Sequence, residues 1–286
     1  MTMSIGIDYK ASVWKTCLTE NGQTIELATF PNGDATLAYI EDVCALYPEP
    51  IIALSSGLET ALCALQTLSE AAEDGEIQAD FADLHTFSET IGTFNAKNFH
   101  LPALKSLKSV PRYRKRKRKD MGSADKLCSV ATLLYRMRQQ EAGWPEMRFL
   151  YLEVSENERG IVVVKDGRII DGMNVTMDVP DENDDGEDEE EREQAFWEGL
   201  AEDVAGLMAI HHFEDIVVID RRSSMQDKLD KRTVVDRLGD TYQFYLFPHN
   251  ESEPEGFETA IGASLIAEGL FRPSLASEVV ERLQVK

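Results

Sequence analysis

The chain has 286 residues, of which 43% are apolar and 28% charged, so it can bury a core and is not disordered throughout. Its 29 Lys and Arg against 52 Asp and Glu give a net charge of −23, which disfavours a general nucleic-acid or anionic-membrane binder. The four cysteines lie 19 or more residues apart without a CxxC pair, which predicts free thiols in a reducing compartment. No apolar run reaches the roughly 20 residues of a membrane span, and the first residues lack a signal-peptide pattern. We therefore expect a soluble cytoplasmic protein.

Two segments concentrate charge of opposite sign. Residues 112–119 (RYRKRKRK) carry seven basic side chains, and residues 178–193 carry eleven acids and one arginine. Because like charges this dense repel one another, we predict a solvated basic connector at 112–119 and a disordered insertion at 178–193. Only Tyr113 interrupts the basic run, and no aromatic array or recognition helix accompanies it, so we do not expect nucleic-acid binding. Two independent loops are the simpler interpretation; an acidic lid that screens the basic run is the alternative.

The first half of the chain predicts a meander followed by helices and a buried strand. Its expected elements are strands at 4–9, 12–19 and 23–30, a helix capped by Asp34, a strand at 50–55 and a helix that carries Leu58 to Leu68. Asn21-Gly22 is a strong signal for a hairpin turn between the second and third strands.

The second half predicts the same order again, after a connecting helix at 123–140. Its expected elements are strands at 147–154, 159–165 and 167–174, a helix at 194–210, a strand at 215–220, a helix at 225–238, a strand at 242–247, and helices at 257–270 and 274–284. Asp166-Gly167 is the corresponding hairpin turn. The repeated order predicts two domains, at 1–111 and 112–286.

A three-strand meander followed by alternating helices and strands is the order of a ribonuclease-H-like layer. Two such layers around a central cleft form actin, the sugar kinases, acetate kinase and the heat-shock chaperone ATPases. The segment DMGSADKL (120–127) resembles the R-x-D-M-G-T-A-D-K signature of an uncharacterised prokaryotic family described as predicted butyrate kinases. The segments VVVKDGRIIDG (162–172) and GFETAIGASLIAEGL (256–270) are similar to the same family. The resemblance implies an α/β fold of two tandem ribonuclease-H-like layers, as in the actin-like ATPases.

The resemblance also implies a nucleotide site. In this superfamily ATP lies in the cleft, two hairpin turns face its phosphates, and an acid at the end of the first strand holds Mg²⁺ through water. Asp8 stands at that strand end, and the turn after it contains Lys10 and Ser12. Asp8 is therefore expected as a catalytic residue and Mg²⁺ ligand, with Lys10 and Ser12 at the phosphates. The alternative is a strand-ending acid followed by a solvated lysine.

The turns expected to bind nucleotide in the second half depart from the superfamily pattern. No glycine occurs between Glu153 and Gly160, so only Glu153, as a second metal-associated acid, and Ser155, as a hydroxyl donor, remain as candidates. After the strand at 215–220 a glycine turn is replaced by RRSS, in which Arg221 contacts an anionic ligand or caps the acidic surface. Both departures weaken the case for ATP turnover.

Two further segments carry candidate ligand residues. Ser123, Asp125 and Lys126 open the connecting helix, where the resemblance implies cofactor contacts from Ser123 and Lys126 and a catalytic role for Asp125. An ordinary helix N-terminus is the alternative. Gly262 is expected either beside the cofactor or at a close helix crossing. His211-His212, at a helix end, is expected to be structural.

The leading functional hypothesis is an ATP- and Mg²⁺-dependent phosphotransferase that acts on a small molecule, with a carboxylate acceptor implied by the family likeness. The alternative is a catalytically degenerate protein that binds a nucleotide or a partner without turnover, which the missing glycines favour. The sequence leaves a homodimer open.

Overall fold

The computed structural model describes residues 3–10, 13–65, 67, 82–155, 158–176, 189–221, 234–239, 241–250 and 253–285. The chain forms two compact units. Unit 1 comprises Met1–Val110, Ser123–Gly143 and His249–Lys286, and unit 2 comprises Pro111–Gly122 and Trp144–Pro248. This division differs from a single boundary between residues 111 and 112, because two later segments pack with the first sheet.

Unit 1 is built on a six-stranded mixed sheet with the order β3-β2-β1-β4-β6-β5. Its elements are β1 (Met3–Lys10), β2 (Val13–Glu20), β3 (Gln23–Phe30), α1 (Gly33–Leu46), β4 (Ile51–Ser55), β5 (Cys63–Ala64), α3 (Ala82–Ile91), β6 (Lys97–His100), a 3₁₀ turn (Leu104–Ser106), α5 (Ala124–Gln139), α8 (Glu258–Phe271) and α9 (Leu275–Leu283). The strands β1, β2 and β3 form an antiparallel meander, whereas β1, β4 and β6 run parallel.

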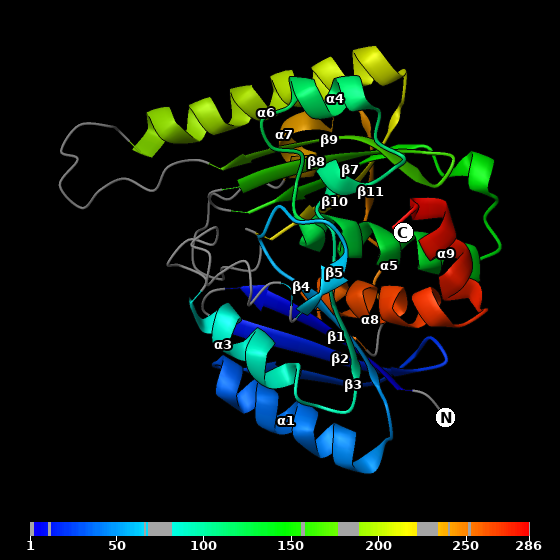
Figure 1. Ribbon diagram of the computed structural model, residues 1–286. Coiled ribbons are helices and arrows are strands. Elements are labelled where there is room, and N and C mark those ends of the chain that lie inside the picture. Colours follow the sequence, from blue (N-terminus) through cyan, green and yellow to red (C-terminus); the bar gives the residue numbers. More distant parts are fainter. Residues whose placement is uncertain are drawn as a thin grey trace. The chain divides into compact units, whose positions relative to one another are not determined.

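The two faces of this sheet pack against different helices (Figure 1). Ile5 and Ile7 of β1 join Ile40 of α1 and Phe87 of α3 in one buried apolar cluster. Successive strand residues point to opposite faces, so Gly6 lies on the other face, beneath α8. A Cβ at Gly6 would lie 2.0 Å from the carbonyl oxygen of Ala260, so the missing side chain permits this close contact.

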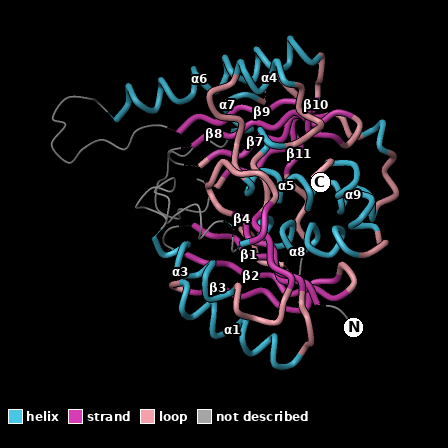
Figure 2. The backbone as a smooth tube through the Cα atoms, viewed as in Figure 1, coloured by secondary structure: helices cyan, strands magenta, loops and turns pink. Residues whose placement is uncertain are grey.

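Unit 2 is built on a five-stranded mixed sheet with the order β11-β10-β7-β8-β9. Its elements are α4 (Arg112–Lys117), a 3₁₀ turn (Trp144–Glu146), β7 (Phe149–Val154), β8 (Glu158–Lys165), β9 (Arg168–Thr176), α6 (Glu189–His211), β10 (Asp215–Asp220), α7 (Val234–Leu238) and β11 (Gln243–Leu246). The helix α6 packs on one face of the sheet (Figure 2), where Phe196, Leu200 and Val204 join strand residues in the second apolar core.

The two sheets share one topology. In each, a central strand has an antiparallel meander on one side and parallel strands on the other: β3-β2-β1-β4-β6 in unit 1 and β9-β8-β7-β10-β11 in unit 2. The protein is thus an α/β protein with two tandem ribonuclease-H-like layers, as the doubled element order predicts.

Two predictions about unit 1 differ from the structure. The predicted helix across Leu58 to Leu68 is wrong in its first part: residues 58–62 are irregular, and residues 63–64 form β5 against β6. The cap of α1 is Asn32, whose side chain accepts a hydrogen bond from the Ala35 amide at 2.9 Å. Asp34 lies in the first turn instead.

The charged runs differ as well. Residues 112–117 form the helix α4 instead of a solvated loop. In the acidic run, residues 189–193 belong to α6, so the predicted disordered insertion does not extend that far. Residues 178–188 lie outside the described part of the chain, as does any contact of theirs with the basic run.

The composition predicted free thiols and no membrane span. All four cysteines are free thiols. Among the described residues, none of the helices combines the length and apolarity that a membrane crossing requires.

Candidate functional site

The candidate site in unit 1 begins with Asp8, at the carboxyl end of β1. Its side chain is 4% exposed and shares a face of the sheet with Gly6, so it points toward the side that α8 covers. In the strand register, Asp8 lies between Lys15 of β2 and Ser55 of β4. One buried carboxylate, one cation and one hydroxyl thus form a row across three strands.

Lys15 is a member of this row that the sequence did not reveal. Its Nζ donates a hydrogen bond of 2.7 Å to the carbonyl of Gly256 and lies 5.1 Å from the centroid of the Phe257 ring. The length of the connection between β1 and β2 could have revealed it, because a two-residue connection fixes a register that places Lys15 opposite Asp8. A second strand expected to begin at residue 12 obscured that register.

The position of the row in the sheet is typical of ligand sites. The chain leaves β1 toward β2 on one side, whereas β4 and β6 extend the sheet on the other. In α/β sheets, ligands bind beyond the carboxyl ends of parallel strands at such a reversal of direction. Asp8 and Ser55 both lie at this edge, between β1 and β4.

The first turn of α5 contains the second expected carboxylate, Asp125, and the same helix contains Cys128. Burial raises the pKa of the Cys128 thiol well above its ordinary value, and the charges of Asp8 and Asp125 raise it further. The charges of both carboxylates thus act on the same buried thiol.

The environment of Asp125 limits its chemistry. Its Oδ1 accepts hydrogen bonds from the Ser123 hydroxyl at 2.6 Å and the Lys126 amide at 2.8 Å. Its Oδ2 accepts from the Lys126 Nζ at 3.1 Å, and Lys126 is only 1% exposed. Asp125 is thus held by its neighbours in the first turn of α5, which suits an orienting group better than a general base.

The other two residues expected at the phosphates are less informative. Lys10 is exposed at the last position of β1. Ser12 lies outside the described residues.

A buried histidine near this edge was missed by the sequence interpretation. His100 ends β6 and is 0% exposed; its Nε2 lies 2.7 Å from the Ser56 hydroxyl and its Nδ1 lies 2.7 Å from the Thr60 hydroxyl. Burial lowers the pKa of His100 to about 4, so the ring is neutral at pH 7. One ring nitrogen therefore donates and the other accepts, which fixes the segment after β4. A single histidine at the end of a short strand carried no sequence signal for this role.

In unit 2, Glu153 does not have the surroundings of a metal ligand. It is the last but one residue of β7 and is 4% exposed. Its carboxylate accepts hydrogen bonds from the Tyr151 hydroxyl at 2.6 Å and the Arg221 Nε at 3.0 Å. Arg221 neutralises this carboxylate, and its backbone amide binds the carbonyl of Val154 at 2.8 Å. Glu153 was expected to bind a metal and Arg221 to contact an anionic ligand, but the two side chains form an ion pair with one another.

Ser155 and Gly262 have structural surroundings. The Ser155 amide and hydroxyl both donate to the carbonyl of Glu158, at 2.8 and 3.4 Å, across the turn between β7 and β8. A Cβ at Gly262 would lie 1.8 Å from the carbonyl oxygen of Cys128, so α8 crosses α5 there in close contact. This is the helix crossing that was the alternative to a cofactor contact. His211 is also structural, as expected, because its Nε2 lies 3.1 Å from a carboxylate oxygen of Asp171.

The Mg²⁺ expectation fits only one of its two residues. Within the described ranges, no three His, Cys, Asp or Glu side chains converge as a ready-made metal site. Magnesium keeps most of its water ligands and needs only one or two carboxylates beside substrate phosphates. Asp8 fits that requirement, whereas Glu153 is bound by Arg221.

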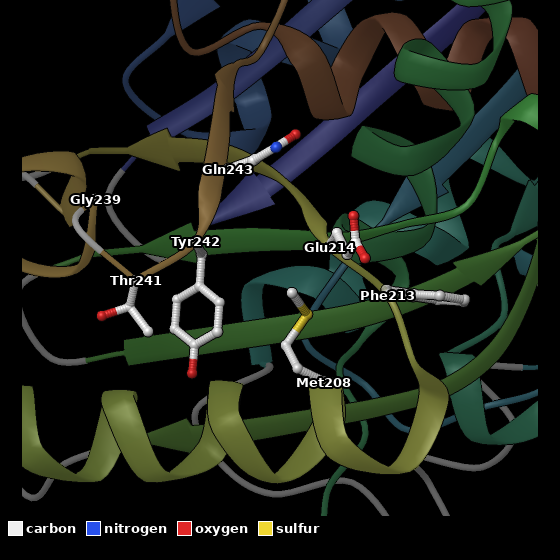
Figure 3. Close-up of a pocket in the computed structure, with 7 residues that line it drawn as sticks. All are labelled: Met208, Phe213, Glu214, Gly239, Thr241, Tyr242 and Gln243. Atoms are coloured by element: carbon white, nitrogen blue, oxygen red, sulfur yellow. The ribbon is translucent and has the colours of Figure 1, made fainter.

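Unit 2 also contains a cavity of about 390 Å³ at the amino ends of β10 and β11 (Figure 3). Its lining residues are Met208, Phe213, Glu214, Gly239, Thr241, Tyr242 and Gln243. In Figure 3 the Tyr242 ring points toward α6, near Met208. None of the expected site residues lines this cavity, and it lies at the edge of the sheet opposite to Glu153.

The topology of the two sheets is that of the actin-like ATPase fold, and a solved structure agrees with it. The Lmo2764 protein of Listeria monocytogenes, a candidate N-acetylmannosamine kinase, is 10% identical, with a TM-score of 0.50 over 92% of this chain and 97% of that one. Acetate kinase from Entamoeba histolytica is 9% identical, with a TM-score of 0.49 over 77% of this chain and 82% of that one. The ROK hexokinase of Thermus thermophilus is 10% identical, with a TM-score of 0.45 over 92% and 97%. At 10% identity, the likeness to the Listeria protein shows the fold alone.

A family model matches residues 47–190, half of the chain, and the chain belongs to that family, "Protein of unknown function (DUF1464)". No curated protein matches the sequence.

Proposed function

We propose that the protein is an ATP-dependent phosphotransferase whose phosphate-binding site is the strand-end row of Asp8, Lys15 and Ser55. The observation that carries this proposal is the row itself: a buried carboxylate opposite a cation at the carboxyl edge of the first sheet. Asp8 would hold Mg²⁺ through water, and Lys15 would add a point charge near the phosphates. Bound Mg²⁺ would supply charge neutralisation at the transferring phosphoryl group.

A carboxylate acceptor is the substrate class that best suits these surroundings. A hydroxyl acceptor must lose a proton as it attacks, which calls for a positioned base. Asp125 is engaged by Ser123 and Lys126, so it is poorly placed to serve as that base. A carboxylate is already deprotonated at pH 7: its oxygen attacks the γ-phosphorus, the bond to the β,γ-bridging oxygen breaks, and ADP leaves with an acyl phosphate as the other product.

The test is a hydroxylamine trap, which converts acyl phosphates into hydroxamates that form coloured complexes with ferric ion. Acetate, propionate, butyrate and longer carboxylates are offered with Mg·ATP to the wild type, to Asp8→Asn and to Asp34→Asn. Asp34 is an exposed acid in the first turn of α1 and serves as the matched control. We expect ATP-dependent hydroxamate from the wild type and Asp34→Asn, and a loss of about 100-fold or more in Asp8→Asn, the scale for removal of one preorganised charge group.

A second candidate is nucleotide or partner binding without turnover. The observation that favours it is the Glu153–Arg221 pair in unit 2, at the strand ends where related folds have a glycine-rich phosphate turn. If no carboxylate yields hydroxamate but ADP or ATP stabilises the protein, this candidate replaces the kinase.

A further inference from the structure

The basic helix α4 is ordered, although its own sequence opposes a helix. It spans six residues, Arg112–Lys117, and all but one of these residues are cationic. A helix this short is unstable alone in water, and like charges one turn apart destabilise it further. Its order must therefore come from contacts with the rest of unit 2.

Those contacts converge on one buried carboxylate. Asp171 of β9 is 0% exposed, and its Oδ2 lies 3.3 Å from Arg114, 3.6 Å from Arg118 and 3.1 Å from His211. Its Oδ1 accepts a hydrogen bond of 3.0 Å from the Gly172 amide. Burial alone would raise the pKa of Asp171, but the bond from His211 and the arginine charges outweigh it and hold the pKa below its ordinary value. The fold thus holds the arginine face of α4 inward.

The opposite face of α4 is left to solvent with a regular set of groups. Arg112 and Arg116 lie one turn apart, as do Tyr113 and Lys117, and all four are exposed. Lys119 extends the exposed row beyond the helix. Tyr113 is 64% exposed, and the Arg114 guanidinium lies 5.2 Å from its ring centroid. An exposed aromatic ring therefore lies among cations on a preorganised surface.

We propose that this outward face, formed by Arg112, Tyr113, Arg116, Lys117 and Lys119, binds single-stranded nucleic acid. The cations meet successive phosphates, and a base stacks on Tyr113, the combination found in sequence-tolerant single-strand binders. The sequence did not predict nucleic-acid binding because no aromatic array or recognition helix accompanies the basic run. In the structure the run forms an anchored helix with one exposed ring among its cations.

The charge around α4 favours single-stranded over double-stranded nucleic acid. Glu198 and Glu202 are exposed on α6, which lies on the same side of the sheet as α4 (Figure 1). A rigid duplex that extended over α6 would be repelled, whereas a flexible single strand needs only the few nucleotides that follow α4. The net charge of −23 makes binding weak away from the helix. The phosphate contacts of the helix make its own binding dependent on salt.

The experiment measures fluorescence anisotropy of a fluorescein-labelled 12-nucleotide oligothymidylate titrated with the full chain. Four exposed cations predict that log K falls against log salt concentration with a slope of about −3, at roughly −0.7 for each phosphate contact on a single strand. Tyr113→Ala should weaken binding about 5-fold or more, the effect of one stacked base. The triple variant R112E/R116E/K117E should abolish binding.

The matched control is K165E/R168E, which reverses two exposed cations on the β8–β9 hairpin of the same unit and should bind as the wild type does. A labelled oligoglutamate peptide of equal length is the competing ligand. The proposal is overturned if the wild type does not bind the oligonucleotide at 50 mM salt, or if the triple variant binds it equally. It is also overturned if oligoglutamate binds more tightly, which would assign α4 to an acidic protein partner.

Discussion

His100 illustrates what a single residue can contribute without any sequence signal. Its two ring nitrogens bind Ser56 and Thr60, and through them it fixes the segment that follows β4 and begins beside Asp8. Those partners lie more than 39 positions away in the chain, so only the parallel pairing of β4 and β6 brings them together. Asp8 itself was predicted from sequence because the family resemblance places an acid at the end of the first strand.

The buried neutral state of His100 predicts a dependence of stability on pH. Its pKa is about 4 in the folded protein against an ordinary 6.5, so the unfolded chain takes up the proton first as pH falls. Stability from this group is complete above about pH 6.5 and is lost between there and pH 4, by about 3 kcal/mol in all. Urea unfolding of the wild type and His100→Gln across this window measures it.

The difference between the two proteins isolates the histidine from other titrating groups. Wild type and His100→Gln should converge in unfolding free energy as pH falls toward 4. If the two curves run parallel from pH 7.5 to 4.5, the histidine is not held neutral by its surroundings.

Among the elements, the meanders were predictable because their turns and alternation are local. Asn21-Gly22 and Asp166-Gly167 all adopt positive φ, from 51° to 74°, as a hairpin turn of this sequence requires. The helix α4 was not predictable, because what orders it is Asp171, about 55 residues away. Nor was β5, since a two-residue strand exists only through its pairing with β6.

Close packing of α8 on the first sheet gives a prediction about two glycines. Gly6→Ala would place a Cβ 2.0 Å from a backbone oxygen of α8, so it should destabilise the protein by about 3 kcal/mol. Gly206→Ala is the matched control, because a Cβ there meets nothing within 4 Å on the exposed face of α6. It should stabilise the protein by about 0.5–1 kcal/mol through helix propensity. Denaturant midpoints measure both.

Equal effects of the two glycine substitutions would contradict the packing argument. A neutral Gly6→Ala would mean that β1 and α8 are further apart than described, and Asp8 would then face a more open environment.

At the scale of the whole molecule, the sequence revealed two similar layers but not how the chain is shared between them. The element order along the chain predicted a single domain boundary, yet α5 and α8 belong to the first unit. The reason is close helix packing at two glycines. Gly6 lets α8 contact β1 closely, and Gly262 lets α8 contact α5 closely. Such complementarity depends on packing between distant segments, which periodicity does not reveal.

The central claim is that Asp8 marks a site for Mg·ATP, and thermal unfolding with and without Mg·ATP tests it most directly. Ligand at 100 times its dissociation constant stabilises the folded state by about 2.7 kcal/mol, which corresponds to a rise in Tm of about 5–10 °C. We predict this rise for the wild type and for Asp34→Asn, and a much smaller one for Asp8→Asn. An unchanged Tm of the wild type at millimolar Mg·ATP, or an equal rise in Asp8→Asn, would contradict the account.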